Sequence, residues 1–292
     1  MSETSETSET SETIEDIILQ QDKRGMSALR PHLPADFCSQ AAGYIMDHPG
    51  GAIIVTGYYA LMSHKPETDG PPGAIAIGNA LQALGRRVTY VTDLHTGPVL
   101  RDWLGPEAEV EEFPIADVPT SQRVASETLA RLKPGLLISI ERSSRTKDDT
   151  YLNMRDIDIS PYTARVDYLF GAGIPSVGIG DGGNEIGMGN LVEIIPTVDS
   201  LPNSPAVTKV DRLVITSVSN WGGYGLVAAL SRLAGKNLLP TVDHETRLIK
   251  RMVEIGVVDG TTGEAIPTVD NFSLEVNSEV LEQLHRAVAE GA

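Results

Sequence analysis

The amino-acid sequence predicts an α/β fold: a mostly parallel, Rossmann-like sheet with helices on both faces. Two observations support this prediction. From Gly51 onward, short apolar runs alternate with helical segments, which is typical of parallel strands covered by helices. A polar residue also follows the end of each predicted strand. We expect residues 14–292 to form a single α/β domain after a disordered low-complexity tail at 1–13, where a Ser-Glu-Thr repeat has no apolar residue after Met1.

The first predicted unit is a strand, a long loop, a helix and a second strand. The strand covers 53–55, the loop 56–70 and the second strand 87–92. Pro71 and Pro72 suit the first turn of the helix, where their missing N–H groups would have no partner anyway, and Gly85 suits its end. Further strands are expected at 136–140, 174–179 and 213–216. Further helices are expected at 122–132, 243–255 and 278–289. Two more are expected: one that Ser160 caps and Pro161 begins, and one that follows 217–224 and ends at about 234.

Polar groups gather at the carboxyl ends of the predicted strands. They are Thr56, Asp93, Glu141, Asp181 and the segment 217–220. Open α/β sheets bind their ligands in the crevice outside these ends. Any single polar residue there is ordinary, but three carboxylates among the strand ends indicate an acidic crevice.

Composition limits the function classes. The formal net charge of −17 repels phosphate backbones and anionic lipid, so we expect no nucleic-acid and no membrane partner, whereas cations are favoured. No apolar run approaches the roughly 20 residues of a membrane span, and the Glu-rich start resembles neither a signal nor a transit peptide. A cytoplasmic protein is therefore predicted. The single cysteine, Cys38, excludes an internal disulfide, and we expect it to be buried and inert.

The segment 178–189 contains six glycines interrupted by Asp181, Asn184 and Glu185. It includes a formal G-x-G-x-x-G after a strand, a pattern of dinucleotide-binding loops. Asp181 would meet the pyrophosphate, which disfavours that interpretation. A carboxylate among glycines is better placed to bind a divalent cation or to orient an amine, although a structural turn also needs glycines.

Glu67 and Asp69 precede the helix that begins at Pro71. They either accept hydrogen bonds from the free N–H groups of that helix or face the crevice, where a cation and the helix N-terminus would hold an anionic substrate. Hard oxygen ligands dominate these loops. A divalent Mg, Mn or Ca ion is therefore favoured over zinc.

Basic residues cluster in the segment 141–155, at Arg142, Arg145, Lys147 and Arg155. An arginine fork matches a carboxylate, so a carboxylate substrate would find a partner here. A solvated loop that neutralises the acidic surface explains Arg145 and Lys147 equally well. The segment 219–225 adds amide, indole and phenol groups suited to a pocket wall.

Together these segments resemble the D-glutamate cyclase family. The matching stretches are 56–59, 67–73, 141–142 with 151 and 153–155, 180–189 and 219–224, within about 51–271. The glycine stretch is the most specific of them. Ser144, Asp149 and Asn271 stand where the resemblance leads us to expect glycine.

The resemblance implies a hydro-lyase that converts a small-molecule substrate, D-glutamate, to 5-oxo-D-proline and water. The α-amine must attack the γ-carboxylate, so the site needs a base and either a divalent cation or a general acid. The expected catalytic residues are Asp181, Asn184 and Glu185. The expected metal ligands are Asp181, Glu67, Asp69, Asp93 and Glu141. The expected substrate-binding residues are Arg142, Arg155, Asn153, Tyr151, Asn220, Gly182 and Gly183.

Two alternatives stay open at this point. The same acidic crevice would serve a phosphatase-like, metal-dependent hydrolase of phosphate esters. It would also serve a non-catalytic protein that binds a cation or a metabolite. A homo-oligomer is compatible with each of these functions.

Overall fold

The computed structural model describes residues 12–291 of the chain. Positions 1–11 of the expected tail lie outside the described residues. Thr13, which the sequence assigns to that tail, is instead the N-cap residue of helix α1 (Ile14–Ile18). Its hydroxyl accepts a hydrogen bond from the backbone N–H of Asp16, and the Asp16 carboxylate accepts one from the backbone N–H of Thr13. This capping box makes Thr13 part of the folded domain.

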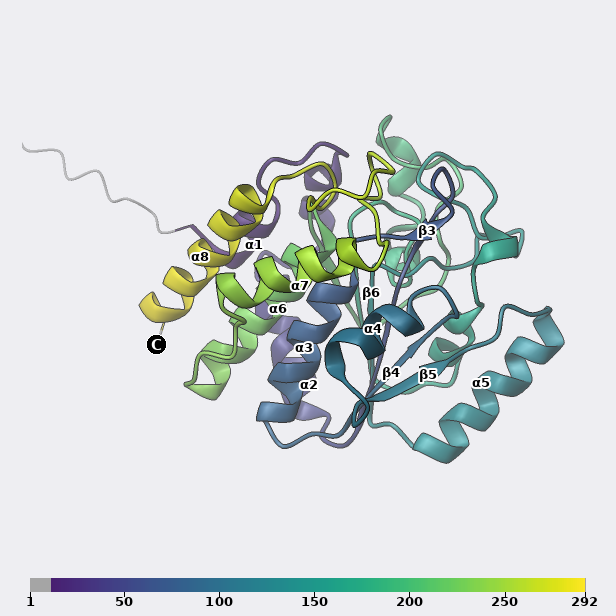
Figure 1. Ribbon diagram of the computed structural model, residues 1–292, viewed down its shortest axis with the longest axis horizontal. Helices are drawn as coiled ribbons and strands as arrows, with labels where there is room; N and C mark the ends of the chain where they lie inside the picture. Colours follow the sequence, from purple (N-terminus) through teal and green to yellow (C-terminus); the bar gives the residue numbers. More distant parts are fainter. Residues whose placement is uncertain (1–11, 292) are drawn as a thin grey trace, which may run out of the picture.

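Six parallel strands form the central sheet, in the order β5-β4-β1-β6-β7-β8. Of these strands, Figure 1 labels β4, β5 and β6. The strands are β1 (Ala52–Thr56), β4 (Val88–Thr92), β5 (Glu109–Glu112), β6 (Leu136–Ile140), β7 (Ser176–Gly180) and β8 (Arg212–Ile215). Numbered along the chain, this is the 3-2-1-4-5-6 order of Rossmann folds, and the order reverses between β1 and β6. The predicted Rossmann-like sheet is confirmed.

The burial of each strand explains whether it can be predicted from the sequence. Every residue of β1, β4, β6 and β7 is buried, as expected for a parallel sheet covered on both faces, so these strands read as largely apolar runs. Strand β5 lies at the sheet edge, is partly exposed and reads Glu-Val-Glu-Glu, so no apolar pattern predicts it. The long loop after β1 contains two short antiparallel strands, β2 (Tyr59–Ala60) and β3 (Lys65–Pro66).

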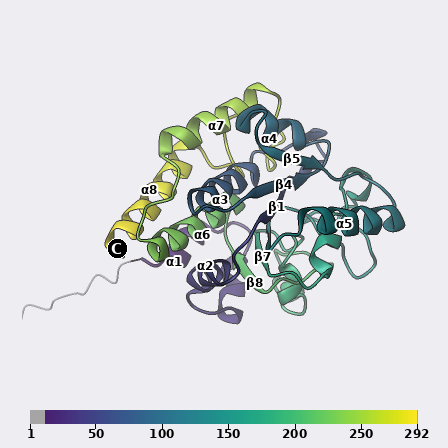
Figure 2. The same cartoon turned by 90° about the horizontal axis from the view of Figure 1, so that it is seen from below.

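Helices cover both faces of the sheet. In Figure 2, α3 (Pro71–Ala83) and α6 (Ser219–Ala234) lie on one side and α5 (Val118–Leu132) lies on the other. Glycines let α3 and α6 pack closely, because a Cβ on Gly223 would lie 2.9 Å from the Cα of Gly73. The other α-helices are α2 (Phe37–Asp47), α4 (Gly97–Leu104), α7 (Val242–Glu254) and α8 (Leu274–Glu290). The 3-10 helices are η1 (Met26–His32), η2 (Ser160–Tyr162), η3 (Val166–Gly171), η4 (Met188–Leu191) and η5 (Ile195–Thr197).

One predicted helix is wrong. Ser160 begins only a single 3-10 turn, whose N-cap position is Ile159. The Ser160 hydroxyl accepts a hydrogen bond from the backbone N–H of Tyr151 at 2.8 Å instead of capping a helix. Cys38, on α2, is buried as predicted, and burial raises the pKa of its thiol well above the usual range. Among residues 12–291, no helix is both long and apolar enough to cross a membrane.

Candidate functional site

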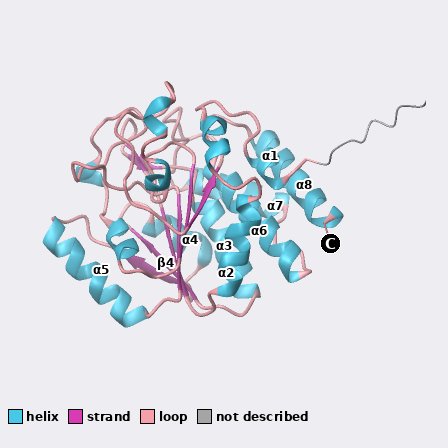
Figure 3. Ribbon diagram, turned by 180° about the vertical axis from the view of Figure 1, so that it is seen from behind, coloured by secondary structure: helices cyan, strands magenta, loops and turns pink. Residues whose placement is uncertain are grey.

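Loops gather at the carboxyl ends of the strands (Figure 3). Residues of these loops line a pocket. Acidic residues that follow β1, β6 and β7 line it, so it lies at the point where the strand order reverses, the usual ligand position of such sheets. It holds about 700 Å³ of empty space, part of it open to solvent. The lining residues are Arg24, Tyr58, Ala60, Leu61, Met62, Glu67, Glu141, Asn153, Met154, Arg155, Asp181, Gly182, Asn184, Glu185, Gly260, Thr261 and Asp270.

The glycine-rich loop after β7 makes room for the carboxyl group of Glu185. A Cβ at Gly180 would lie 2.8 Å from Glu185 Oε2, and one at Gly182 would lie 2.9 Å from Oε1. Oε1 accepts a hydrogen bond from the backbone N–H of Asp181, whereas Oε2 is buried without a partner among the described residues. Burial and the charge of Asp181 raise the pKa of Glu185 to about 8. Glu185 can therefore gain and lose a proton near neutral pH.

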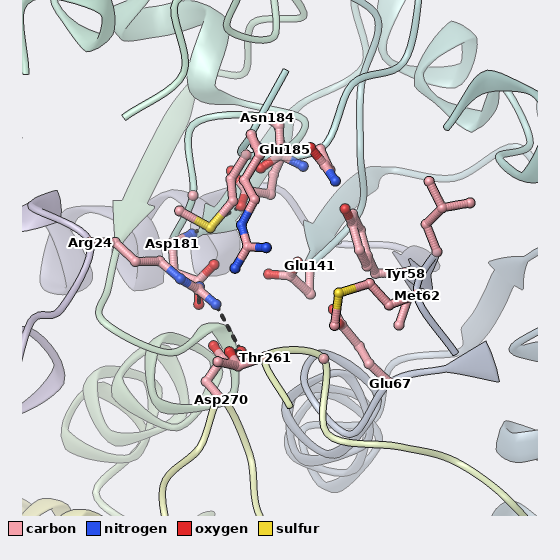
Figure 4. A pocket seen from close by; sticks show the side chains of 17 residues that line it. Arg24, Tyr58, Met62, Glu67, Glu141, Asp181, Asn184, Glu185, Thr261 and Asp270 are labelled. Carbon is pink, nitrogen blue, oxygen red and sulfur yellow. Dashed lines mark hydrogen bonds and ion pairs between the residues drawn. The ribbon is translucent and has the colours of Figure 1, made fainter. Parts of the chain in front are cut away.

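Arg24 bridges Asp181 and Asp270 in the pocket (Figure 4). Its Nη1 lies 2.5 Å from Asp181 Oδ2, and its Nη2 lies 2.8 Å from Asp270 Oδ1. The other oxygen of Asp270 is buried without a partner among the described residues. Burial raises the pKa of Asp270 to about 7, an effect that Arg24 partly offsets and Asp181 increases. The positively charged guanidinium of Arg24 thus lies between two of the acidic side chains of the pocket.

Glu141 and Glu67 extend the acidic wall. Glu141 has a φ of +43°, a backbone conformation uncommon outside glycine, and its Oε2 accepts a hydrogen bond from the Ser219 hydroxyl at 2.6 Å. Burial, followed by the charge of Asp181, holds the pKa of Glu141 well above its usual range. Burial, followed by the charge of Asp270, has the same effect on the pKa of Glu67.

Two groups of carboxylates have the geometry to hold a metal ion. The first is Asp69, Asp181 and Asp270, and the second is Glu141, Asp181 and Glu185. Within each group, one oxygen from each residue lies within 4.8 Å of the others. The second group fits a hard divalent cation, because it offers carboxylate oxygens from three side chains and Glu185 Oε2 has no partner. In the first group, Arg24 already contacts two of the three acids.

Asp69 and Asn220 lie beside the pocket rather than in its wall. The Asp69 carboxylate accepts hydrogen bonds from the backbone N–H groups of Gly70, Ser219 and Asn220, so it caps α6 and not the helix from Pro71 that the sequence suggested. The Asn220 side-chain oxygen accepts the N–H groups of Gly70 and Gly73, and its nitrogen donates to a backbone carbonyl. The structure therefore does not place Asn220 where it could bind a substrate.

Arg142 and Asp93 form a buried ion pair away from the pocket wall, with Arg142 Nη1 2.6 Å from Asp93 Oδ2. Both Nη atoms of Arg142 also donate to backbone carbonyls. Arg142, which we expected to bind the substrate, thus neutralises Asp93, which we expected to bind a metal ion. Tyr151 is also buried outside the wall, and its hydroxyl donates to Asp167. Gly183 has a φ of +88° and does not line the pocket either.

The pocket wall contains eight of the residues that the sequence predicts for the site: Glu67, Glu141, Asn153, Arg155, Asp181, Gly182, Asn184 and Glu185. Sequence patterns do not predict Tyr58, Arg24 and Asp270, which also line the pocket. Tyr58 lies two residues beyond β1, so the strand-end pattern could have found it. Arg24 and Asp270 lie before the first strand and after the last one, and no local pattern marks them.

The strand order and the buried carboxylates at its reversal point define a Rossmann-like α/β protein with an acidic pocket. The family model described as D-glutamate cyclase-like, C-terminal, matches residues 14–285. The chain therefore belongs to this family, and the resemblance found in the sequence is confirmed.

One relative of the chain is the Homo sapiens protein named D-glutamate cyclase, mitochondrial. The two are 30% identical over 289 residues, an alignment that covers 83% of this chain and 46% of the human protein. The chain thus spans about half the length of that relative. The name places the human protein in mitochondria, and a cytoplasmic location for this chain stays a prediction.

Proposed function

We propose that this protein interconverts D-glutamate and 5-oxo-D-proline plus water. Family membership supports the reaction class. The observation that carries the proposal is the carboxyl group of Glu185, which is buried in the pocket, has one oxygen without a partner among the described residues, and has a pKa of about 8. A group with these properties suits proton transfer at neutral pH.

Cyclisation moves two protons from the α-ammonium group of glutamate to one oxygen of its γ-carboxylate. The amine nitrogen forms a bond to the γ-carbon, the carbon–oxygen bond breaks, and the oxygen leaves as water. No net proton passes to the solvent. In our proposal the Glu185 carboxylate, through an oxygen that no cation occupies, accepts the two protons from the amine one after the other and passes each to the departing oxygen. Because both reacting groups belong to one molecule, holding it curled supplies much of the entropic saving.

The charges in the pocket suit a zwitterionic dicarboxylate. Five carboxylic side chains line it, namely Glu67, Glu141, Asp181, Glu185 and Asp270, and they would attract the ammonium group. Arg24 and Arg155 line the same pocket and would attract the substrate carboxylates. Asn153 and Asn184 add amide groups that can donate hydrogen bonds to carboxylate oxygens.

We also propose that a divalent Mg, Mn or Ca ion binds the Glu141, Asp181 and Glu185 group. When bound, it would polarise the γ-carboxylate as a Lewis acid. The support for this proposal is the grouping of three carboxylate oxygens within 4.8 Å of one another in the pocket.

The test is to incubate the purified protein with D-glutamate, and separately with 5-oxo-D-proline, with Mn²⁺ or a chelator, and to separate the products by chiral chromatography. Glu185→Gln should lose about 100-fold or more of the activity. Glu107→Gln, at an exposed position, is the matched control and should lose none. Turnover of a phosphomonoester without turnover of D-glutamate would favour a hydrolase instead. Substrate binding without turnover would favour a binding protein.

A further inference from the structure

Arg24 enters the acidic pocket from a segment that precedes the sheet, and its backbone is held on both sides. The Asp22 carboxylate accepts a hydrogen bond from the Arg24 N–H at 3.0 Å. The Ser200 hydroxyl donates to the Arg24 carbonyl at 2.6 Å. The next residue, Gly25, has a φ of +89°, and a Cβ there would lie 2.5 Å from Ser200 Oγ. These contacts fix the direction in which the side chain leaves the backbone.

The guanidinium lies where the Asp69, Asp181 and Asp270 group would otherwise bind a metal ion. The side chains of Asp181 and Asp270 that it contacts are only 1% and 7% exposed. Asp69 accepts three N–H groups with its two oxygens, which leaves it capacity for one more partner. Asp270 Oδ2 is buried in the group without a partner among the described residues, so the acids offer more acceptors than the guanidinium satisfies.

We propose that Arg24 is a tethered cation that takes the place of a metal ion between Asp181 and Asp270. While it is present, the Asp69, Asp181 and Asp270 group binds no divalent cation. The Glu141, Asp181 and Glu185 group is then the metal position of the pocket. This inference goes beyond the proposed reaction and is tested by metal binding, so its outcome does not depend on whether D-glutamate is a substrate.

The experiment counts bound Mn²⁺ per chain by equilibrium dialysis and follows the Tm in Mn²⁺ and in chelator. Arg24→Gln keeps a polar side chain but removes the charge, so it should bind one more Mn²⁺ per chain than the wild type. Mn²⁺ should also raise its Tm more than that of the wild type, because the ion restores the missing charge between buried carboxylates. Arg24→Lys keeps the charge and should retain the wild-type count.

Arg155→Gln is the matched control, because Arg155 lines the same pocket but is exposed. It should leave the Mn²⁺ count unchanged. An equal count in the wild type and R24Q would overturn the proposal, as would an equal gain in R155Q, which would reduce the effect to net charge. The double variant R24Q/D270N loses a ligand together with the guanidinium and should return to the wild-type count. If R24Q does not fold in chelator, refolding with Mn²⁺ supports the proposal and failure to refold with Mn²⁺ contradicts it.

Discussion

Asp69 and Asn220 cap each other's helix. The Asp69 carboxylate, just before α3, accepts the first N–H groups of α6, at 2.9 Å from Ser219 and 2.8 Å from Asn220. The Asn220 side-chain oxygen, in the first turn of α6, accepts N–H groups at the start of α3, at 3.0 Å from Gly70 and 2.9 Å from Gly73. Each helix N-terminus, with its partial positive charge, thus faces an oxygen from the other. The exchange fixes the two helices side by side next to the pocket.

Asn220→Ala should lower the free energy of unfolding by about 1–3 kcal/mol. The buried N–H of Gly73 loses its acceptor, and the N–H of Gly70 keeps only Asp69. Asn79→Ala, at an exposed position of α3, is the matched control and should change it by about 0.5 kcal/mol or less. Urea unfolding measures both variants. Equal losses would show that the Asn220 oxygen contributes nothing special.

The stability of the metal-free protein should fall as the pH rises. The carboxyls of Glu185 and Asp270 have pKa values of about 8 and about 7 in the folded protein, against 4.5 and 3.8 ordinarily, so the folded state binds their protons more tightly. Their contribution to stability is complete below about pH 4 and is lost progressively up to about pH 8. In chelator, we expect a Tm lower at pH 8 than at pH 5.5 by about 5 °C or more.

Glu185→Gln is neutral at every pH and should flatten this dependence. Glu107→Gln, at an exposed position, should leave it unchanged. The measurement is a series of thermal melts across the pH range. A wild-type Tm that rises from pH 5.5 to pH 8 would contradict the raised pKa values.

Mn²⁺ or Mg²⁺ should stabilise the wild type by about 2.7 kcal/mol at a hundred times the dissociation constant, because the ion binds the folded protein and not the unfolded chain. The bound cation also removes repulsion between buried carboxylates. Asp181→Asn should lose most of this gain, since Asp181 belongs to both carboxylate groups. Asp243→Asn, whose side chain is 78% exposed, should keep it. Calorimetric titration gives the affinities directly. Equal metal affinity in the wild type and D181N would refute the assignment.

Removal of residues 1–11 should leave the Tm unchanged within about one or two degrees, because positions 2–11 contain no apolar side chain. Removal of Thr13 as well should cost about 1 kcal/mol, since α1 loses its N-cap. Calorimetric scans of the two truncated chains, with Thr13→Ala in the full chain for comparison, separate the effects. A large loss from the shorter truncation would refute the sequence-based expectation for this segment.

The sheet and the acidic pocket edge are predictable because both are encoded locally. Buried parallel strands appear as apolar runs, and Glu141 and Asp181 directly follow two of them. The pairing of Arg142 with Asp93 is not predictable in this way, since it depends on β4 and β6 lying on either side of β1. Arg24 likewise reaches the pocket only through the tertiary fold.

Backbone conformation accounts for two departures from the expected family pattern. Asp149 and Asn271, which stand where glycine is expected, both have a φ of +58°. Aspartate and asparagine are among the non-glycine residues that best tolerate this region, so the turns persist. Ser144, the third departure, is buried, and its hydroxyl donates to Thr208 Oγ1 at 2.6 Å.

The ion pair between Arg24 and Asp270 can form only after Asp270 has been synthesised. Its two members come from segments near opposite ends of the sequence, which the contact of Lys23 with the ring of Phe272, 3.4 Å from its centroid, also joins. A ribosome-bound chain that has completed β8 contains every strand of the sheet but lacks Asp270. Synthesis must therefore pass Asp270 before this ion pair can form. A product that stops before Asp270 contains the sequence of every strand but leaves Asp181 without this bridge to the far segment.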